Sequence, residues 1–149
     1  MRFVYDDGGR VAAGYKGRAG DCVVRAIAIA TQSPYQEVYD AINNLVRADS
    51  SRKAWTRSSA RNGVPRAIYE QYLNMLGWVW VPTMRIGSGC RVHLKARELP
   101  RGRLIVRLSR HLSAVVDGTI HDIYNPDRKG RRCVYGYFTS AQADTAPEV

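Results

Sequence analysis

The stretch Gly20-Asp21-Cys22-Val23-Val24-Arg25-Ala26-Ile27-Ala28-Ile29-Ala30 decides the fold of this chain. It follows a glycine-rich approach, and its apolar run is typical of a buried helix. Asp21 is a residue type that caps helices, so Cys22 is predicted to take the first helical position. A thiol there faces the positive end of the helix dipole, which favours the thiolate. Cys22 is therefore a candidate nucleophile, and a small buried core residue is the alternative.

Two more helices are predicted before the middle of the chain. Apolar residues recur at helical spacing after Pro34, and again from Arg66 to Leu76 with Gly77 as a C-terminal cap. Between these helices, residues 47–65 are polar and basic and indicate a long surface loop. A basic loop with one large aromatic residue can also hold a substrate, so Trp55 is a candidate for the substrate cleft.

The last third of the chain is rich in strand-forming residues and predicts four strands: Arg103–Leu108, His111–Val116, Thr119–Tyr124 and Cys133–Phe138. Asp117-Gly118 stands between the second and the third of them. This dipeptide between two apolar strands is a strong hairpin signal and implies a two-residue type I′ turn. The sequence therefore fixes the expected register of the hairpin.

This register places candidate catalytic residues side by side. Ser113 is opposite Asp122 and His111 is opposite Tyr124, so all four lie on one side of the sheet. His111 and Asp122 become diagonal neighbours within hydrogen-bond reach, whereas His121 falls on the other face. A carboxylate beside an imidazole fixes its tautomer and supports the imidazolium, as a general base requires.

The chain thus offers a cysteine at a helix start, a histidine on a strand and a carboxylate on the next strand. They form a triad if the sheet packs against the N-terminus of the first helix. A thiolate–imidazolium pair would then attack an acyl carbon, with the Cys22 backbone amide helping to bind the oxyanion. The alternative for His111 and Asp122 is a hydrogen-bonded pair without a catalytic role.

These residues resemble the papain-like cysteine peptidase superfamily, whose members carry Cys, His and a polar third residue in this order. The layout is similar to compact bacterial members, such as cell-wall endopeptidases and bacteriocin-leader peptidases. The patterns Asp-Cys-Val-x-Arg-Ala and Arg-His-x-x-Ala-Val-x-Asp-Gly-x-x-His-Asp also resemble small proteins of bacteria and their phages. The resemblance implies an α+β fold with N-terminal helices packed on a C-terminal antiparallel β-sheet. It implies Cys22 as nucleophile, His111 as general base and acid, and Asp122 as the orienting carboxylate.

The sequence departs from the superfamily at one position. Many papain-like enzymes carry a glutamine shortly before the nucleophile as an oxyanion donor, and here Lys16 occupies that place. No glutamine lies between Met1 and Cys22. Lys16, Tyr15 or a backbone amide is expected to take the role, or the activity is weak or lost.

The length, charge and cysteine content of the chain indicate its domain organisation, its partners and its compartment. The 149 residues suit one domain, expected over residues 1–140 with a flexible tail at 141–149. The net charge of +10 favours an acidic protein or peptide substrate, with nucleic acid as a less favoured partner. No run suits a membrane span and no signal-peptide pattern is present. Three cysteines, an odd number, argue against a disulfide framework and fit the cytoplasm of a bacterial or phage-infected cell.

Two rival interpretations remain beside the peptidase. Cys90 and His93 have the spacing of half a zinc site, but a paired Cys-x-x-Cys is missing, so no metal or cofactor is expected. The glycine-flanked Ser88 is instead a candidate for the substrate cleft. The second rival is an inactive papain-like binding module whose basic surface binds nucleic acid or an acidic protein. The favoured function is a cysteine peptidase or related thiol hydrolase that cleaves an amide, isopeptide or thioester bond.

Overall fold

The computed structural model describes residues 1–49 and 58–140, so Trp55 and the tail at 141–149 lie outside the described residues. The described helices are α1 (Cys22–Thr31), α2 (Tyr35–Ala48), α3 (Arg66–Met75) and a short 3-10 helix, η1 (Ala96–Glu98). The described strands are β1 (Arg2–Tyr5), β2 (Trp78–Pro82), β3 (Val92–His93), β4 (Arg103–Leu108), β5 (His111–Val116), β6 (Thr119–Asp122), β7 (Cys133–Val134) and β8 (Gly136–Ser140). This mixture of helices and sheet is the expected α+β class.

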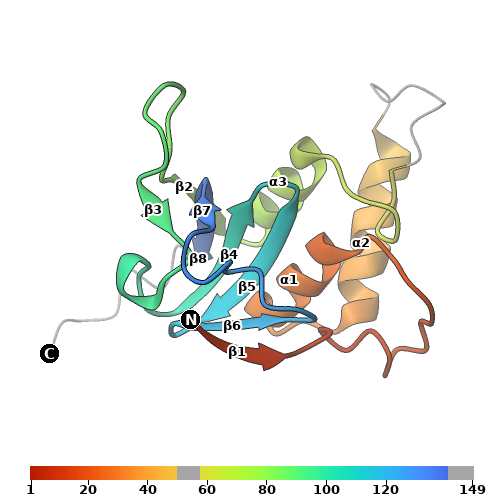
Figure 1. The fold of residues 1–149 in the computed structure, drawn as a ribbon. Coiled ribbons are helices and arrows are strands. Elements are labelled where there is room, and N and C mark those ends of the chain that lie inside the picture. Colours follow the sequence, from red (N-terminus) through yellow and green to blue (C-terminus); the bar gives the residue numbers. More distant parts are fainter. Residues whose placement is uncertain (50–57, 141–149) are drawn as a thin grey trace, which may run out of the picture.

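The main sheet has six strands in the order β1-β6-β5-β4-β8-β2 (Figure 1). All its pairs are antiparallel except β1 with β6, which is parallel. The predicted C-terminal antiparallel sheet corresponds to the four central strands β6, β5, β4 and β8. It does not cover the two edge strands, which come from the first 82 residues and of which β1 pairs in parallel. The edge strand β1 is four residues long and exposed throughout, so it carries no alternating pattern from which its pairing could be predicted.

The predicted hairpin register is confirmed. Val116 pairs with Thr119 and Val115 with Ile120, with the two-residue turn at Asp117-Gly118 between them. Both turn residues have positive φ, +47° and +78°, as a type I′ turn requires.

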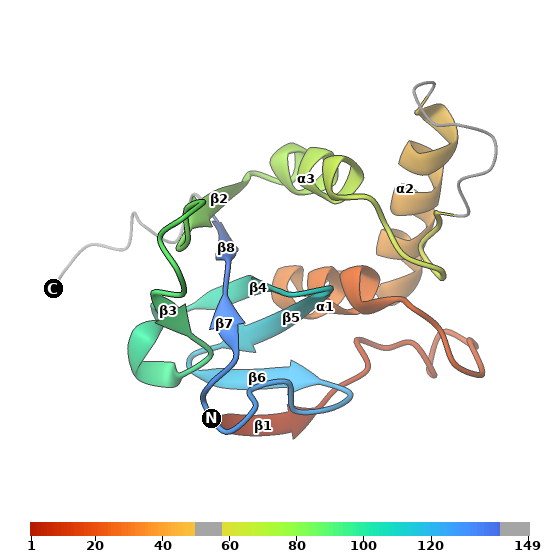
Figure 2. The same ribbon diagram turned by 45° about the horizontal axis from the view of Figure 1, so that its top comes forward.

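Helix α1 lies against β5 and β4, α2 packs against α1, and α3 packs against α2 and the edge strand β2 (Figure 2). Every α1 residue from Val23 to Ala30 is buried, and Ile105, Leu112 and Ala114 contribute to the same core from the sheet. The helix begins at Cys22 and β5 begins at His111, as predicted. The N-terminus of the first helix and the start of the histidine strand are thus held in one core.

A second core covers the opposite face of the sheet. Val106 of β4, Val115 of β5 and Ile120 of β6 pack there. Leu94 and Val134, in and beside the small β3–β7 pair, complete this core. Successive residues of a strand point to opposite faces of the sheet, so they contribute to two different cores.

The β3–β7 pairing brings Cys90 and Cys133 together as a disulfide, with their Cα atoms 5.8 Å apart. The expectation that the three cysteines are unpaired is wrong for these two. They are 43 residues apart in the chain, so only the pairing of two short strands reveals their proximity. Cys22 is the one free thiol.

Residues 58–65, the described part of the predicted surface loop that precedes α3, are packed against the rest of the protein. Ala60 is fully buried, and its N–H donates to the Asn43 side chain on α2 at 2.9 Å. The Arg61 guanidinium donates to the carbonyls of Lys16 and Arg18. These contacts fix residues 58–65 beside the glycine-rich approach to Cys22. No helix in the described part of the chain has the length and apolar character that crossing a membrane requires.

Candidate active site

Asp21 occupies the N-cap position of α1 as predicted, but its side chain makes no capping hydrogen bond. The carboxylate turns instead toward the Arg25 guanidinium and the Tyr35 hydroxyl, the latter at 2.6 Å. Charged donors hold a carboxylate more strongly than a neutral backbone N–H does. The first N–H groups of a helix have no acceptor within the helix, so the Cys22 N–H remains available as an oxyanion donor.

The His111 ring is fixed by a buried carboxylate. Its Nε2 lies 2.6 Å from Asp122 Oδ2, which also accepts a hydrogen bond from the Ser113 hydroxyl at 2.7 Å. The Ile123 N–H donates to Asp122 Oδ1, and the Tyr124 ring stacks 5.1 Å from the imidazole centroid. Since Nε2 faces Asp122, Nδ1 is the ring nitrogen left for another partner.

Burial lowers the pKa of His111, but Asp122 and the Cys22 thiol outweigh it. Hydrogen bonds and negative charge from these two groups raise the pKa of His111 to about 9. The ring is therefore an imidazolium near neutral pH, held between a carboxylate and a thiol.

The opposite shift occurs at Cys22. Burial, the largest single influence, raises the pKa of the thiol, whereas hydrogen bonds from the His111 side chain and the Leu112 backbone N–H lower it. The positive charges of His111 and Arg25 act in the same direction, so the net pKa lies below its ordinary value of 9.0. The pKa values of the thiol and the imidazole are thus shifted in opposite directions, as in cysteines activated by a neighbouring histidine.

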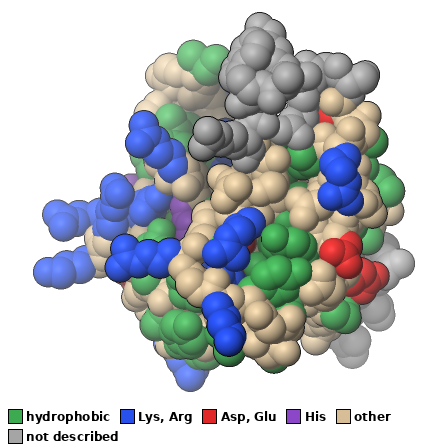
Figure 3. All heavy atoms as spheres, turned by 90° about the vertical axis from the view of Figure 1, so that its right-hand side faces the viewer, with side chains coloured by type: hydrophobic (Ala, Val, Ile, Leu, Met, Phe, Trp, Pro, Cys, Tyr) green, Lys and Arg blue, Asp and Glu red, His purple; other side chains and the backbone are tan. Residues whose placement is uncertain are grey.

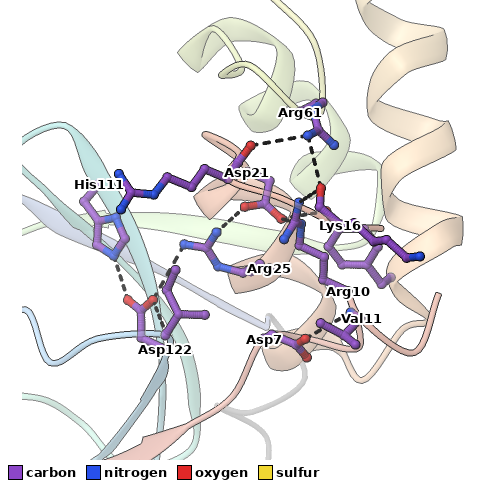
Figure 4. Close-up of polar contacts among 12 residues, drawn as sticks. Asp7, Arg10, Val11, Lys16, Asp21, Arg25, Arg61, His111 and Asp122 are labelled. Carbon is purple, nitrogen blue, oxygen red and sulfur yellow. Dashed lines mark hydrogen bonds and ion pairs between the residues drawn. The ribbon is translucent and has the colours of Figure 1, made fainter. Parts of the chain in front are cut away.

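Arg25 is a site residue that the sequence reasoning missed. It lies between two buried carboxylates (Figure 4), paired with Asp21 and with its Nη2 3.8 Å from Asp122 Oδ1. Arg10 completes the network with its Nε 3.3 Å from Asp21 Oδ2. Burial, and then the Asp21 carboxylate, raise the pKa of Tyr35, so the phenol stays protonated as a donor. The spacing of Asp21 and Arg25, one helical turn apart, is the sequence signal that could have indicated this pair.

A cavity of about 420 Å³ opens at Cys22 and His111. The strand end and turn at residues 107–112 form one wall. The other wall combines Gly63 and Val64 from the packed segment with Tyr69 from α3. The candidate thiol is thus accessible from a hollow large enough for a substrate side chain and backbone.

The other residues predicted for the site lie elsewhere. Tyr15 stacks on Tyr35 and Tyr39, and its hydroxyl donates to Gln36 at 2.8 Å. The Lys16 carbonyl accepts from Arg10 and Arg61, and neither Lys16 nor Tyr15 lines the cavity at Cys22. The Ser88 hydroxyl forms hydrogen bonds with backbone groups of its own loop and does not line this cavity. No group of three or more His, Cys, Asp or Glu side chains within residues 1–49 and 58–140 is placed to hold a metal ion.

No family model, curated protein or solved structure matches this chain. The function is therefore inferred from the geometry of the site itself.

One prediction concerns the pH dependence of stability. A folded-state pKa of about 9 for His111, raised from 6.5, gives stability that is complete below pH 6.5 and is lost as the pH rises through 9. We expect Asp122→Asn to destabilise the protein most below pH 6.5. The difference in unfolding free energy between the two proteins should shrink, by about 1–3 kcal/mol, as the pH rises. Urea unfolding at several pH values measures it, and a difference that is constant or grows with pH contradicts the assignment.

Proposed function

We propose that this protein is a papain-like cysteine peptidase or related thiol hydrolase, with Cys22, His111 and Asp122 as its triad. The observation that carries the proposal is the pair of opposite pKa shifts at Cys22 and His111, in a cavity open to substrate. A thiol that only fills a core is not expected to have a lowered pKa, because burial alone raises it.

The chemistry follows from the positions of these groups. The Cys22 thiolate attacks an acyl carbon, and the Cys22 N–H at the start of α1 donates to the developing oxyanion. The His111 imidazolium then protonates the leaving amine or thiol, so the C–N or C–S bond breaks and a thioester to Cys22 remains. Neutral His111 next takes a proton from water, whose hydroxide adds to the thioester. The acid leaves as the thiolate returns, and Asp122 holds the imidazole in one orientation throughout.

The second candidate is an inactive module that binds anionic partners. Lys and Arg side chains stand at several places on the face in Figure 3 and gather toward one edge of it. This distribution favours binding of anions over the surface. It gives no reason for a lowered thiol pKa, so we rank this candidate second.

The test is a burst experiment with p-nitrophenyl acetate, an activated ester that needs no specific recognition. We expect a burst of p-nitrophenol matching the protein concentration, an acetyl group on Cys22 in the mass spectrum, and slow turnover afterwards. Cys22→Ser should lose the burst, while His121→Ala, which changes a histidine outside the triad, should keep it. Release without a burst, with acetyl groups spread over lysines, would overturn the proposal.

A further inference from the structure

A second cavity, of about 290 Å³, adjoins the one at Cys22. The two share Arg66, Arg107 and Tyr135 in their linings. Beyond this shared wall, the second cavity is lined mainly by apolar side chains together with one arginine: Trp80, Pro82, Met84, Ile86 and Arg85. A groove therefore leads from the candidate thiol past two guanidinium groups to an apolar hollow.

The groove is positive along its length. Its lining includes Arg66, Arg85, Arg107 and Arg110, and none of the lining residues is an Asp or Glu. A partly buried guanidinium that has no ion-pair partner can bind a carboxylate of a ligand.

The arginines of the groove differ in whether a carboxylate of the protein already forms an ion pair with them. Arg66 is ion-paired with Glu70 and lies over the Trp80 ring at 5.2 Å. Arg107 is half-buried on β4, and no carboxylate in the described part of the chain forms an ion pair with it. Arg107 also lines both cavities, so its charge is presented between the thiol and the apolar hollow.

We propose that Arg107 binds an acidic side chain of a peptide substrate close to the scissile bond, while a neighbouring apolar side chain of that peptide lies against Trp80. This subsite rests on the proposed function, because it selects the substrate of the Cys22 thiolate. A peptide fits both features, since it can carry a charged and an apolar side chain at neighbouring positions. A nucleic acid offers phosphates but no aliphatic side chain for the apolar hollow.

The first experiment compares two alkylating agents that differ in charge. Cys22 of the full chain is labelled with iodoacetate, an anion, and with neutral iodoacetamide, and mass spectrometry locates the label. We expect Arg107→Gln to lower the iodoacetate-to-iodoacetamide rate ratio about five- to tenfold. Arg107→Lys, which keeps the charge, should retain most of the ratio. The matched control is Arg97→Gln, an exposed arginine outside both cavities that changes the net charge equally.

The second experiment uses peptide pools that fix either Glu or Gln at one position and vary the others. Glu pools should slow the iodoacetamide labelling of Cys22 more than Gln pools, and Arg107→Gln should remove the difference. Equal effects of Arg107→Gln and Arg97→Gln would overturn the subsite, as would protection by a single-stranded oligonucleotide but not by Glu peptides. Labelling by iodoacetamide at the rate of an ordinary thiol would instead overturn the proposed function, so the two failures are distinguishable.

Discussion

Replacing His111 by alanine is expected to slow the alkylation of Cys22 by iodoacetamide about a hundredfold near neutral pH. The thiolate is the reacting species, and His111 supplies both a hydrogen bond and a positive charge that lower the Cys22 pKa. Without the imidazolium, burial still raises the pKa of Cys22, while two of the influences that lower it are lost. The rate of carbamidomethylation at Cys22, followed by mass spectrometry, measures the effect.

The control for this variant is His121→Ala. His121 lies on β6 next to Asp122 in sequence, but its Nδ1 lies 3.3 Å from Asp6 Oδ2, away from the thiol. We expect its removal to change the alkylation rate less than about twofold. Equal slowing in both variants would show that the loss of a histidine disturbs the fold. An unchanged rate in His111→Ala would contradict the thiolate–imidazolium pair.

Replacing Arg25 by methionine is expected to lower the free energy of unfolding by about 3–5 kcal/mol. The Arg25, Asp21 and Asp122 side chains are 7%, 1% and 3% exposed, so the variant leaves two buried carboxylates without their shared cation. Asp21 keeps Arg10 and Asp122 keeps His111, but the loss of a partner from a buried ion pair is costly because the remaining negative charge is less well compensated. Urea unfolding followed by tryptophan fluorescence measures it.

A matched ion pair on the surface provides the control. Arg66 and Glu70 have the same spacing along α3, but their side chains are 47% and 33% exposed. We expect Arg66→Met to cost less than about 1 kcal/mol. If the two arginine variants destabilise the protein equally, the buried network does not have the importance that we assign to it.

The contact between His111 and Asp122 could be predicted from the sequence because it depends on local geometry. The dipeptide Asp117-Gly118 specifies a two-residue turn, which sets the register of the two strands. Because side chains alternate between the faces of a strand, this register puts His111 and Asp122 on the same face. The helix start at Cys22 was predictable for a similar reason, since a polar residue before an apolar run marks a helix N-terminus.

Contacts between distant segments could not be predicted in this way. The disulfide of Cys90 with Cys133 depends on the pairing of two strands of two residues each, too short for any periodic signal. The burial of Ala60 in a polar stretch depends on its fit against Asn43 of α2.

Arg25 is a different case, because a charge inside an apolar helix normally indicates an exposed position. It is buried here because Asp21 and Asp122 approach it from the same helix and from the sheet. The sequence pattern of α1 contains only the first of these two partners. The tertiary structure thus supplies the second half of the network on which the candidate site rests.

Titration of the His111 ring by NMR, in the wild-type protein and in Cys22→Ala, tests the central claim most directly. We predict a wild-type pKa of about 9, and a clear fall in Cys22→Ala because the thiol contributes to the raised value. The signals of the other two histidines are assigned with His93→Ala and His121→Ala. A wild-type pKa at or below the ordinary 6.5, or a value that Cys22→Ala leaves unchanged, would contradict the thiolate–imidazolium pair.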